Sequence, residues 1–405
     1  MNKFWPVLSL LVVGFIATLG TFWAFQRGGK DFDVFYTAWS LVLAGRAQEI
    51  YTLSPDRFLY APGFAFLFAP IALLPKTLAL ALWCFAKAAL LGLVLRSFAK
   101  RVYMREQPLV GAGFCAVGAL IWSRAILIDF EYGQVNLFIL GVCVWALSSH
   151  YNRERSGFLP WLLLAIAGVA KVFPLPLLWI PFLMGWSQAR EKLKQERWGV
   201  IVGLMLVGAL PFFLQGFEGG LHLLASWREA LLAKGLPTES HNQSFAALLL
   251  HYFSGNPTAV ISENGSLIQF GASIFTADTL KLIELAWTFV TGGLLLGWIV
   301  SGPSKEPLKW IAITIGLLIL PLHLIWKPYF VMGIPVAILL VRQAQVSRHL
   351  IAMLVATFFV INFSGFDFTG HAWGPKLEAA ALLLVVHIAL IGALVYMKPK
   401  TAESI

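Results

Sequence analysis

The sequence has little charge for its length. Only 12% of its 405 residues are Asp, Glu, Lys or Arg, whereas about a quarter of the residues in a soluble globular protein are charged. Hydrophobic residues make up 59% of the chain, and the mean hydropathy is +0.78. This composition, with its repeated long apolar stretches, excludes a soluble fold and predicts that lipid surrounds most of the chain.

Cysteine is scarce, and several enzyme signatures are missing. Cys84, Cys115 and Cys143 each stand alone in an apolar run, so neither a zinc site nor a disulfide framework is expected. The sequence contains no Walker loop, no HExxH, no GxSxG and no glycine-rich dinucleotide fingerprint. It also lacks a soluble domain that would bind a nucleotide. A substrate for this protein would therefore be carried by a lipid and reach its site through the bilayer.

The long apolar stretches predict an all-α polytopic membrane protein, in which residues 1–405 form a single integral membrane domain with interfacial helices in its outer loops. A spanning helix needs about 20 apolar residues. About twelve transmembrane helices are expected, at 4–25, 60–95, 108–128, 134–149, 158–171, 172–187, 198–216, 277–300, 308–325, 329–341, 349–364 and 376–397. Pro70 and Pro75 should break the stretch 60–95 into a short re-entrant or interfacial start and one crossing. The two short spans that meet at Lys171 are expected to form a helical hairpin.

The placement of the basic residues predicts the topology. The formal net charge is +10, and more than half of the Lys and Arg residues lie in short segments between apolar stretches or near the chain ends. Such clusters mark cytoplasmic loops, so they indicate orientation in the membrane and not nucleic-acid binding. We therefore expect a bacterial inner-membrane protein with both termini in the cytoplasm. The large segments 26–59 and 217–276 then face the periplasm, where a membrane enzyme with this topology would carry its chemistry.

The first outer loop contains two aspartates at the membrane boundary, Asp31 and Asp33. A carboxylate that is partly removed from water binds a proton more tightly, which suits a general base that takes a proton from a sugar hydroxyl. In a helix the two side chains diverge, and in an extended segment they share a face. The alternative is structural, because an aspartate in this position could simply begin an interfacial helix.

Polar residues interrupt apolar sequence at two further places. Asp129 and Glu131 are followed by Gln134 and Asn136 in a segment expected to join two spans at the outer rim, although a short loop needs polar groups in any case. Lys171 lies between two apolar half-segments. A lysine at membrane depth must either extend its ammonium group to the interface or meet an anion, such as a lipid phosphate.

Two later segments also combine polar and aromatic residues. Asn242 and Gln243 precede the apolar run 245–253, a pattern that fits an amphipathic outer helix with a polar leading edge. His323 and Trp326 are three residues apart, so on a helix they would share one face. A histidine at a helix end can equally be structural, but several titratable groups are expected on this side of the membrane, which favours a functional site.

Together these segments resemble the motifs of glycosyltransferase family 87, the polyprenol-phosphate-mannose-dependent mannosyltransferase-like proteins of the GT-C superfamily. The resemblance is carried by short stretches that occur in the same order, namely Asp31 to Tyr36 with Gly45, Tyr51 and Phe58 to Pro62, then Gly133-Gln134-Val135-Asn136, Lys171-Val172-Phe173-Pro174, Asn242-Gln243-Ser244, and Trp326 with Tyr329. Each stretch is short, but the ordered set is fairly specific.

The resemblance implies a GT-C fold with a periplasmic active site. It also implies a polyprenyl-phosphate-sugar donor, in which the sugar is mannose or another pentose or hexose, and a lipid or glycan hydroxyl that attacks with inversion. The family's catalytic aspartate corresponds to Asp31, with Asp33 as an additional acid. This sequence departs from the family in one place, where Lys327-Pro328 stands in the position of a frequent His. His323, one turn earlier, could substitute for it as a catalytic residue.

These expectations assign a role to each candidate. Asp31 removes the acceptor proton, while Lys171 and Lys327 neutralise the phosphate leaving group. The expected substrate-binding residues are Tyr36, Trp39, Tyr60, Gln134, Asn136, Asn242, Gln243 and Trp326, with the amides on sugar or phosphate oxygens and the tryptophans stacked on a sugar face. No metal or other cofactor is needed, because lysines supply the positive charge. The expected partners are the donor, the acceptor and membrane lipids, with no nucleic acid.

Two other classes of function fit parts of the sequence. A lipid-linked-sugar flippase or a transporter would move its substrate without cleaving a bond, and would need charged residues around a mid-membrane cavity. The acids concentrate instead at one rim, and no inverted repeat is visible, which disfavours transport. An inactive structural partner in an envelope-building complex would explain the departure at Lys327-Pro328.

Overall fold

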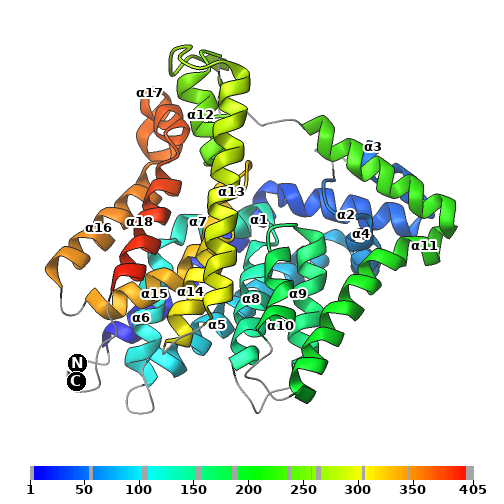
Figure 1. Ribbon diagram of the computed structural model, residues 1–405, viewed down its shortest axis with the longest axis horizontal. Coiled ribbons are helices and arrows are strands. Elements are labelled where there is room, and N and C mark those ends of the chain that lie inside the picture. The colour runs from blue at the N-terminus through cyan, green and yellow to red at the C-terminus, as the bar shows by residue number, and fades with distance from the viewer. Residues whose placement is uncertain are drawn as a thin grey trace. The chain divides into compact units, whose positions relative to one another are not determined.

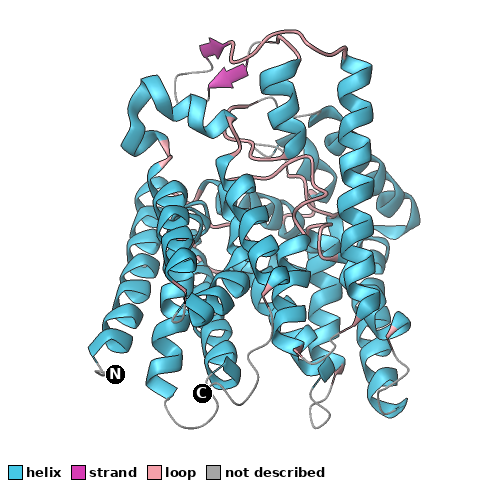
Figure 2. Ribbon diagram, turned by 60° about the vertical axis from the view of Figure 1, so that its left-hand side comes forward, coloured by secondary structure: helices cyan, strands magenta, loops and turns pink. Residues whose placement is uncertain are grey.

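The structure is a computed structural model in which helices account for most of the described residues (Figures 1 and 2). It describes residues 4–53, 58–102, 108–151, 157–184, 190–234, 239–256, 258–260, 266–302, 306–344 and 347–397. Among the described residues, a small antiparallel pair of strands, β1 (Thr258–Val260) and β2 (Ser266–Ile268), departs from the predicted all-α class. The predicted fold class is therefore confirmed at the level of a helical protein.

The chain divides into two compact units, each assembled from separate stretches of sequence. The Asp31 unit comprises Ala17–Val94 and Leu127–Gly235. The His323 unit comprises Met1–Ile16, Leu95–Ile126 and Leu236–Ile405. The predicted site residues fall into both units, so each unit holds part of the set.

The Asp31 unit contains, wholly or in part, α1 (Phe4–Arg27), α2 (Lys30–Leu43), η1 (Ala47–Glu49), α3 (Ile50–Leu53), α4 (Pro62–Phe68), η2 (Ala69–Leu73), α5 (Lys76–Val102), α7 (Ser123–Tyr132), α8 (Asn136–Tyr151), α9 (Phe158–Ala170), η3 (Leu175–Trp179), α10 (Ile180–Leu183) and α11 (Arg190–Lys234). Glycines allow α9 and α11 to pack closely. A Cβ at Gly199 would lie 2.3 Å from the carbonyl oxygen of Phe158, and one at Gly203 would lie 2.6 Å from that of Leu162. Small residues four apart are typical of close helix contacts in membranes.

Helices of this unit break at Pro75, as predicted, and at Gly216, where no break was predicted. The stretch 60–95 separates at Pro75 into the short helices α4 and η2 and the 27-residue helix α5, as predicted. In α11 the backbone is left-handed at Gly216, with φ 73°, and Figure 1 shows the ribbon changing direction within this helix. The prediction of a span at 172–187 is wrong, because its described residues form only the short pieces η3 and α10.

The His323 unit contains, wholly or in part, α1, α5, α6 (Pro108–Ile121), α7, α12 (Phe245–Phe253), α13 (Ala277–Ser301), α14 (Pro307–Leu317), η6 (Lys327–Gly333), α15 (Ile334–Ala344), α16 (Arg348–Phe363), α17 (Phe366–Ala379) and α18 (Leu382–Tyr396). Its centre is the contact of α6 with α15, where a Cβ at Gly118 would lie 2.7 Å from the Cα of Ile338. Both helices are therefore in backbone contact, which fixes the core of this unit.

At each of two helix breaks in the His323 unit, one buried amide side chain forms hydrogen bonds with backbone groups on both sides of the break. Between α6 and α7, which bend by 72°, Asn362 donates to the carbonyl of Ile121 at 3.1 Å and accepts from the backbone N–H of Arg124 at 2.8 Å. Between α17 and α18, Gln243 donates to the carbonyl of Glu378 at 2.6 Å and accepts from the N–H of Leu383 at 3.4 Å. Each amide thus satisfies backbone groups that a broken helix leaves open. The segment 108–128, predicted as one span, therefore consists of two helices with a sharp bend between Ile121 and Ser123.

Four helical segments in the described residues are long and apolar enough to cross a membrane, at Leu10–Arg27, Lys76–Lys100, Arg190–Ala233 and Ala277–Ser301. The number rises to six if each of two bent helix pairs counts as one span, and further apolar helices are shorter. A membrane protein is supported, while the twelve crossings and the GT-C type remain predictions. Parts of the predicted basic cytoplasmic segments, at 103–107, 152–156, 303–305 and 398–405, lie outside the described residues.

Candidate active site

Asp31 and Asp33 lie in the first turn of α2, directly after the end of α1. Gly28 and Gly29 form the connection, with φ values of 75° and 57°, a left-handed conformation that glycine adopts without strain. The aspartates suit this position because the N-terminal end of a helix carries partial positive charge. Residues two apart on a helix point about 200° away from each other, so the two carboxylates face different surroundings.

The side-chain amide of Gln134 joins the predicted base to a predicted phosphate-binding lysine. Its Nε2 donates to Oδ2 of Asp31, and its Oε1 accepts from Nζ of Lys171 at 3.2 Å. Gln134 itself is buried, whereas Asp31 and Lys171 are each partly exposed. One buried amide therefore holds a carboxylate and an ammonium group that were assigned to the two ends of the same reaction.

Gly133 brings this amide against α2. Its φ is 67°, and a Cβ in its place would lie 2.5 Å from the Cβ of Phe32. Its carbonyl accepts a hydrogen bond from Nε1 of Trp83 at 2.9 Å. A larger residue would push the connection between α7 and α8 away from α2. This close contact explains why the Gly-Gln-x-Asn stretch begins with glycine.

Asn136 continues the contacts into the interior. Its Oδ1 accepts from Nζ of Lys171 at 2.9 Å, and its Nδ2 donates to Oδ2 of Asp129 at 3.1 Å. Nζ of Lys87 lies 2.8 Å from Oδ1 of Asp129, and both side chains of this pair are fully buried. The chain of contacts, which we call the Asp31 network, consists of Asp31, Gln134, Lys171, Asn136, Asp129 and Lys87.

Lys87 was not predicted as a site residue, and Asp129 had no predicted role. The available signal was the place of Lys87 within the long apolar helix α5, because an ionisable residue inside such a helix needs a partner. The partner is 42 residues away in the chain, and only the fold brings the two together. A buried ion pair is retained only when both charges are well placed, and this pair fixes the position of Asn136 below Lys171.

Asp33 and Tyr36 point to other partners. Asp33 forms an ion pair with Lys76, and both side chains are about two-fifths exposed. The hydroxyl of Tyr36 donates to the carbonyl of Leu74 at 2.9 Å. These contacts tie α2 to the segment that precedes α5. They place Asp33 and Tyr36 outside the Asp31 network, and they favour a role in holding α2 over the predicted roles in catalysis and substrate binding.

Trp39 is fully buried among aromatic rings. Its ring centroid lies 5.8 Å from that of Phe32, 5.6 Å from that of Trp83 and 6.1 Å from that of Phe68. This packing accounts for Trp39 as part of the core of the Asp31 unit and leaves it no exposed face for a sugar, contrary to the predicted stacking role.

Tyr60 is only partly buried, and its ring lies 4.9 Å from that of Phe35. The hydroxyl of Tyr51 donates to the carbonyl of Tyr60 at 2.9 Å, and burial raises the pKa of the Tyr51 phenol, which keeps it a donor. The tyrosines of this signature thus fix the chain before α4. The predicted substrate-binding role of Tyr60 is untested.

In the His323 unit, Asn242 and Gln243 bind the main chain. Oδ1 of Asn242 accepts from the N–H of Ile325 at 3.0 Å, and its Nδ2 donates to the carbonyl of His323 at 3.1 Å. Ser244 caps α12 by accepting from the N–H of Ala247 at 3.1 Å. Together with Gln243, which bonds across the α17–α18 break, Asn242 and Ser244 hold the backbone of these segments in place. Both amides are buried, which favours a structural role over the predicted contact with substrate.

His323, Trp326 and Lys327 occupy an irregular segment and the start of η6. The predicted helical stacking of His323 with Trp326 is wrong, because α14 ends at Leu317 and the chain from 321 to 326 is not helical. His323 is exposed, and the Trp326 ring lies 5.8 Å from that of His241. Lys327 forms an ion pair with Glu378 in which each side chain is 13% exposed. Sequence reasoning did not identify this carboxylate, which already neutralises Lys327.

The match to a family model decides the identity of the chain. The model described as glycosyltransferase family 87 matches residues 58–322, more than half of the sequence. The chain belongs to glycosyltransferase family 87. This membership, which the ordered motifs predicted, indicates a membrane glycosyltransferase with a sugar donor and an acceptor. No curated protein matches the chain.

The family 87 match covers most of the Asp31 network. Gln134, Asn136 and Lys171 lie inside the matched residues, as do Asp129 and Lys87. Asp31 precedes the start of the match, so its connection to the family 87 region rests on the hydrogen bond to Gln134. The predicted base and the matched region therefore meet at one amide.

Proposed function

We propose that this family 87 protein transfers a sugar from a polyprenyl-phosphate donor to a hydroxyl group of a lipid or glycan acceptor on the periplasmic side of the inner membrane, with inversion at the anomeric carbon. The acceptor oxygen forms a bond to the anomeric carbon while the bond from that carbon to the phosphate oxygen breaks. The leaving group is polyprenyl phosphate, and the acceptor proton passes to a base.

Asp31 is the base in this proposal, and Lys171 receives the leaving group. The carboxylate of Asp31 takes the acceptor proton as the new bond forms. The ammonium group of Lys171 offsets the negative charge that develops on the phosphate. Asn136 and the buried pair of Asp129 and Lys87 hold Lys171 in place, because Asn136 accepts from its Nζ and is itself held by Asp129.

The observation that carries the proposal is the double hydrogen bond of Gln134 to Asp31 and Lys171. A lysine held only for packing has no reason to share an amide with a partly exposed aspartate at a helix start. A base and a cation for a leaving group must be kept a fixed distance apart on either side of the reacting carbon. A rigid, buried amide between them provides such a spacing.

The test is a transfer assay with the full-length protein reconstituted in lipid. Radiolabelled polyprenyl-phosphate sugars, with mannose first, are incubated with a lipid extract as acceptor, and products are identified by mass. We expect the label in a new glycosylated product and an equal amount of unlabelled polyprenyl phosphate, with no transfer from a nucleotide sugar. An intact donor that only changes leaflet would contradict the proposal and indicate a flippase.

The side of the membrane is tested by thiol labelling. The native cysteines are buried, so Thr52→Cys, at an exposed position of the first outer loop, reports on that loop alone. We expect a membrane-impermeant thiol reagent to modify this variant on intact spheroplasts. Modification only after lysis would place the loop in the cytoplasm and contradict a periplasmic site.

A further inference from the structure

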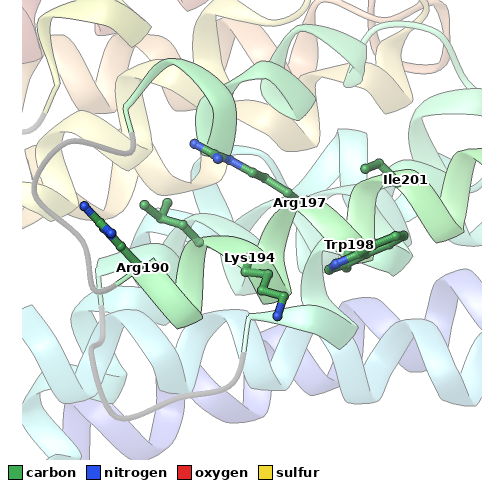
Figure 3. Close-up of a pocket in the computed structure, with 6 residues that line it drawn as sticks. Arg190, Lys194, Arg197, Trp198 and Ile201 are labelled. Carbon is green, nitrogen blue, oxygen red and sulfur yellow. The ribbon is translucent and has the colours of Figure 1, made fainter.

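A basic pocket lies at the start of α11, within the Asp31 unit. It encloses about 390 Å³ and is lined by Arg190, Leu193, Lys194, Arg197, Trp198 and Ile201. Figure 3 shows that the labelled side chains come from successive turns of one helix. None of the described residues that line the pocket is acidic, so three cations stand together without a carboxylate among them.

This pocket lies at the other end of α8 and α9 from the Asp31 network. Lys171 directly follows the last residue of α9, whereas the start of α11 packs on the first residue of α9, with Gly199 against Phe158. The 13 residues of α9 separate the two ends by about 20 Å at 1.5 Å per residue. The proposed catalytic residues and the basic pocket therefore belong to opposite ends of these helices.

The inner face of α11 fixes its first turns against the end of α8. Nζ of Lys192 donates to the carbonyls of Ser149 and His150 at 2.6 and 2.7 Å. Nδ1 of His150 lies 2.8 Å from Oε2 of Glu196. Lys192 and Glu196 are buried. This polar anchor determines which face of α11 remains outward, and that face carries the pocket.

The outward face is cationic at helical spacing. Arg190, Lys194, Arg197 and Ile201 recur at intervals of four, three and four residues, which places them on one side of a helix. Nε of Arg197 donates to the carbonyl of Pro181 at 3.1 Å, so this guanidinium group is already held in position. Arg190 and Lys194 are exposed and can approach a ligand from the same side.

The lining combines features that suit a phosphate attached to an apolar chain. Arginine and lysine bind phosphate oxygens through charge and several N–H donors, and the start of a helix adds partial positive charge. Trp198 is 51% exposed and Ile201 is 37% exposed, directly beyond the cations on a helix that is long and apolar enough to span a membrane. Tryptophan is enriched where the headgroups meet the hydrocarbon. A free phosphate ion would gain no stabilising contact from this apolar surface.

We infer that the α11 pocket binds the phosphate of an anionic phospholipid, such as phosphatidylglycerol, in the leaflet opposite to the Asp31 network. The headgroup phosphate meets Arg190, Lys194 and Arg197, and an acyl chain follows Trp198 and Ile201. This assignment is independent of the proposed transfer reaction, because it concerns a different end of the helices and a ligand that is not consumed.

The test compares two matched double variants of the full-length protein by native mass spectrometry in detergent. R190Q/K194Q removes two pocket cations and keeps the Arg197 contact with Pro181. R96Q/K100Q removes two exposed cations of α5 that do not line the pocket. Each protein is titrated with phosphatidylglycerol, with zwitterionic phosphatidylcholine and, separately, with inorganic phosphate.

We expect R190Q/K194Q to bind phosphatidylglycerol roughly 30-fold more weakly than the parent protein, because each cation near an anionic lipid contributes about a factor of five. R96Q/K100Q should bind like the parent, and phosphatidylcholine should bind weakly to all three. Equal weakening in both variants, or no change in R190Q/K194Q, would overturn the pocket. Displacement of the lipid by inorganic phosphate at equal concentration would overturn the lipid as its ligand. If the double variant does not fold, the single variant K194Q gives the same comparison at about fivefold.

Discussion

Buried amide side chains have different partners in the two units of this molecule. In the Asp31 unit, Gln134 and Asn136 bond to the side chains of charged residues. In the His323 unit, Gln243 and Asn362 bond chiefly to backbone groups on both sides of a helix break. The residue type is the same in both places, but the first pair connects ionisable groups and the second pair fixes the path of the chain.

The difference bears on what a ligand can do in each unit. A charged side chain at the partly exposed end of a network can exchange its partner for a substrate, because the alternative bond is of the same kind and strength. A backbone carbonyl or N–H at a helix break has no such freedom, since losing its buried partner leaves it unsatisfied. This difference supports our proposal that the Asp31 network carries the chemistry, whereas Gln243 and Asn362 hold the backbone in place at helix breaks.

The largest expected effect is on stability and comes from the buried end of the Asp31 network. Lys87→Met leaves the carboxylate of Asp129 buried without its cation, which should lower the free energy of unfolding by about 3–5 kcal/mol. Unfolding in mixed micelles measures this change. The double variant Lys87→Met with Asp129→Leu removes both charges and should recover most of the loss. A stable Lys87→Met protein would mean that the pair is not buried as described.

The next largest expected effect is on kcat and comes from Lys171, the partly exposed lysine of the Asp31 network. Lys171→Gln keeps a polar group but removes the positive charge opposite the leaving phosphate, so kcat should fall about 10²–10³-fold. Lys30→Gln, which removes an exposed lysine next to Asp31, serves as the control and should change kcat little. Steady-state kinetics of sugar transfer distinguishes the two. An unchanged kcat in Lys171→Gln would remove the lysine from the mechanism.

A matched pair of glutamine variants tests the comparison of amides directly. Gln134→Ala removes hydrogen bonds to two charged groups, so transfer should fall roughly 10–100-fold while the protein stays folded. Gln243→Ala leaves backbone groups unsatisfied on both sides of a helix break, which should destabilise the protein by about 1–3 kcal/mol. Activity assays and unfolding measurements are made on both. If both variants lose only stability, the proposed difference between Gln134, which serves the reaction, and Gln243, which holds the backbone, is wrong.

Much of the local structure of this chain could be predicted from the sequence. Long apolar runs and prolines such as Pro75 act through the backbone of their own segment, so α1, α5 and the break before α5 were expected. The break at Trp122 was not, because it contains neither proline nor glycine and depends on Asn362, more than 230 residues away in the chain. A break supported from a distance leaves no local signal.

The candidate site divides in the same way. Asp31, Gln134, Asn136 and Lys171 were chosen as polar residues in apolar surroundings and by likeness to a family, and the fold brings all four into one network. The function of an amide could not be read from its type, because the same side chain fits a sugar hydroxyl and a backbone carbonyl equally well. For this reason Asn242 and Gln243, which bind the backbone, were predicted to bind the substrate.

The most direct test uses the two aspartates of α2, which differ in their partners and share a helix turn. Asp31→Asn preserves the size of the side chain and can still accept from Gln134, but it cannot take a proton. Transfer should fall by about 10²–10⁴-fold, while Asp33→Asn, which affects only the exposed pair with Lys76, should transfer sugar at about the parent rate. Near-normal transfer by Asp31→Asn would contradict the assignment of the base. Loss of transfer in Asp33→Asn alone would contradict it as well.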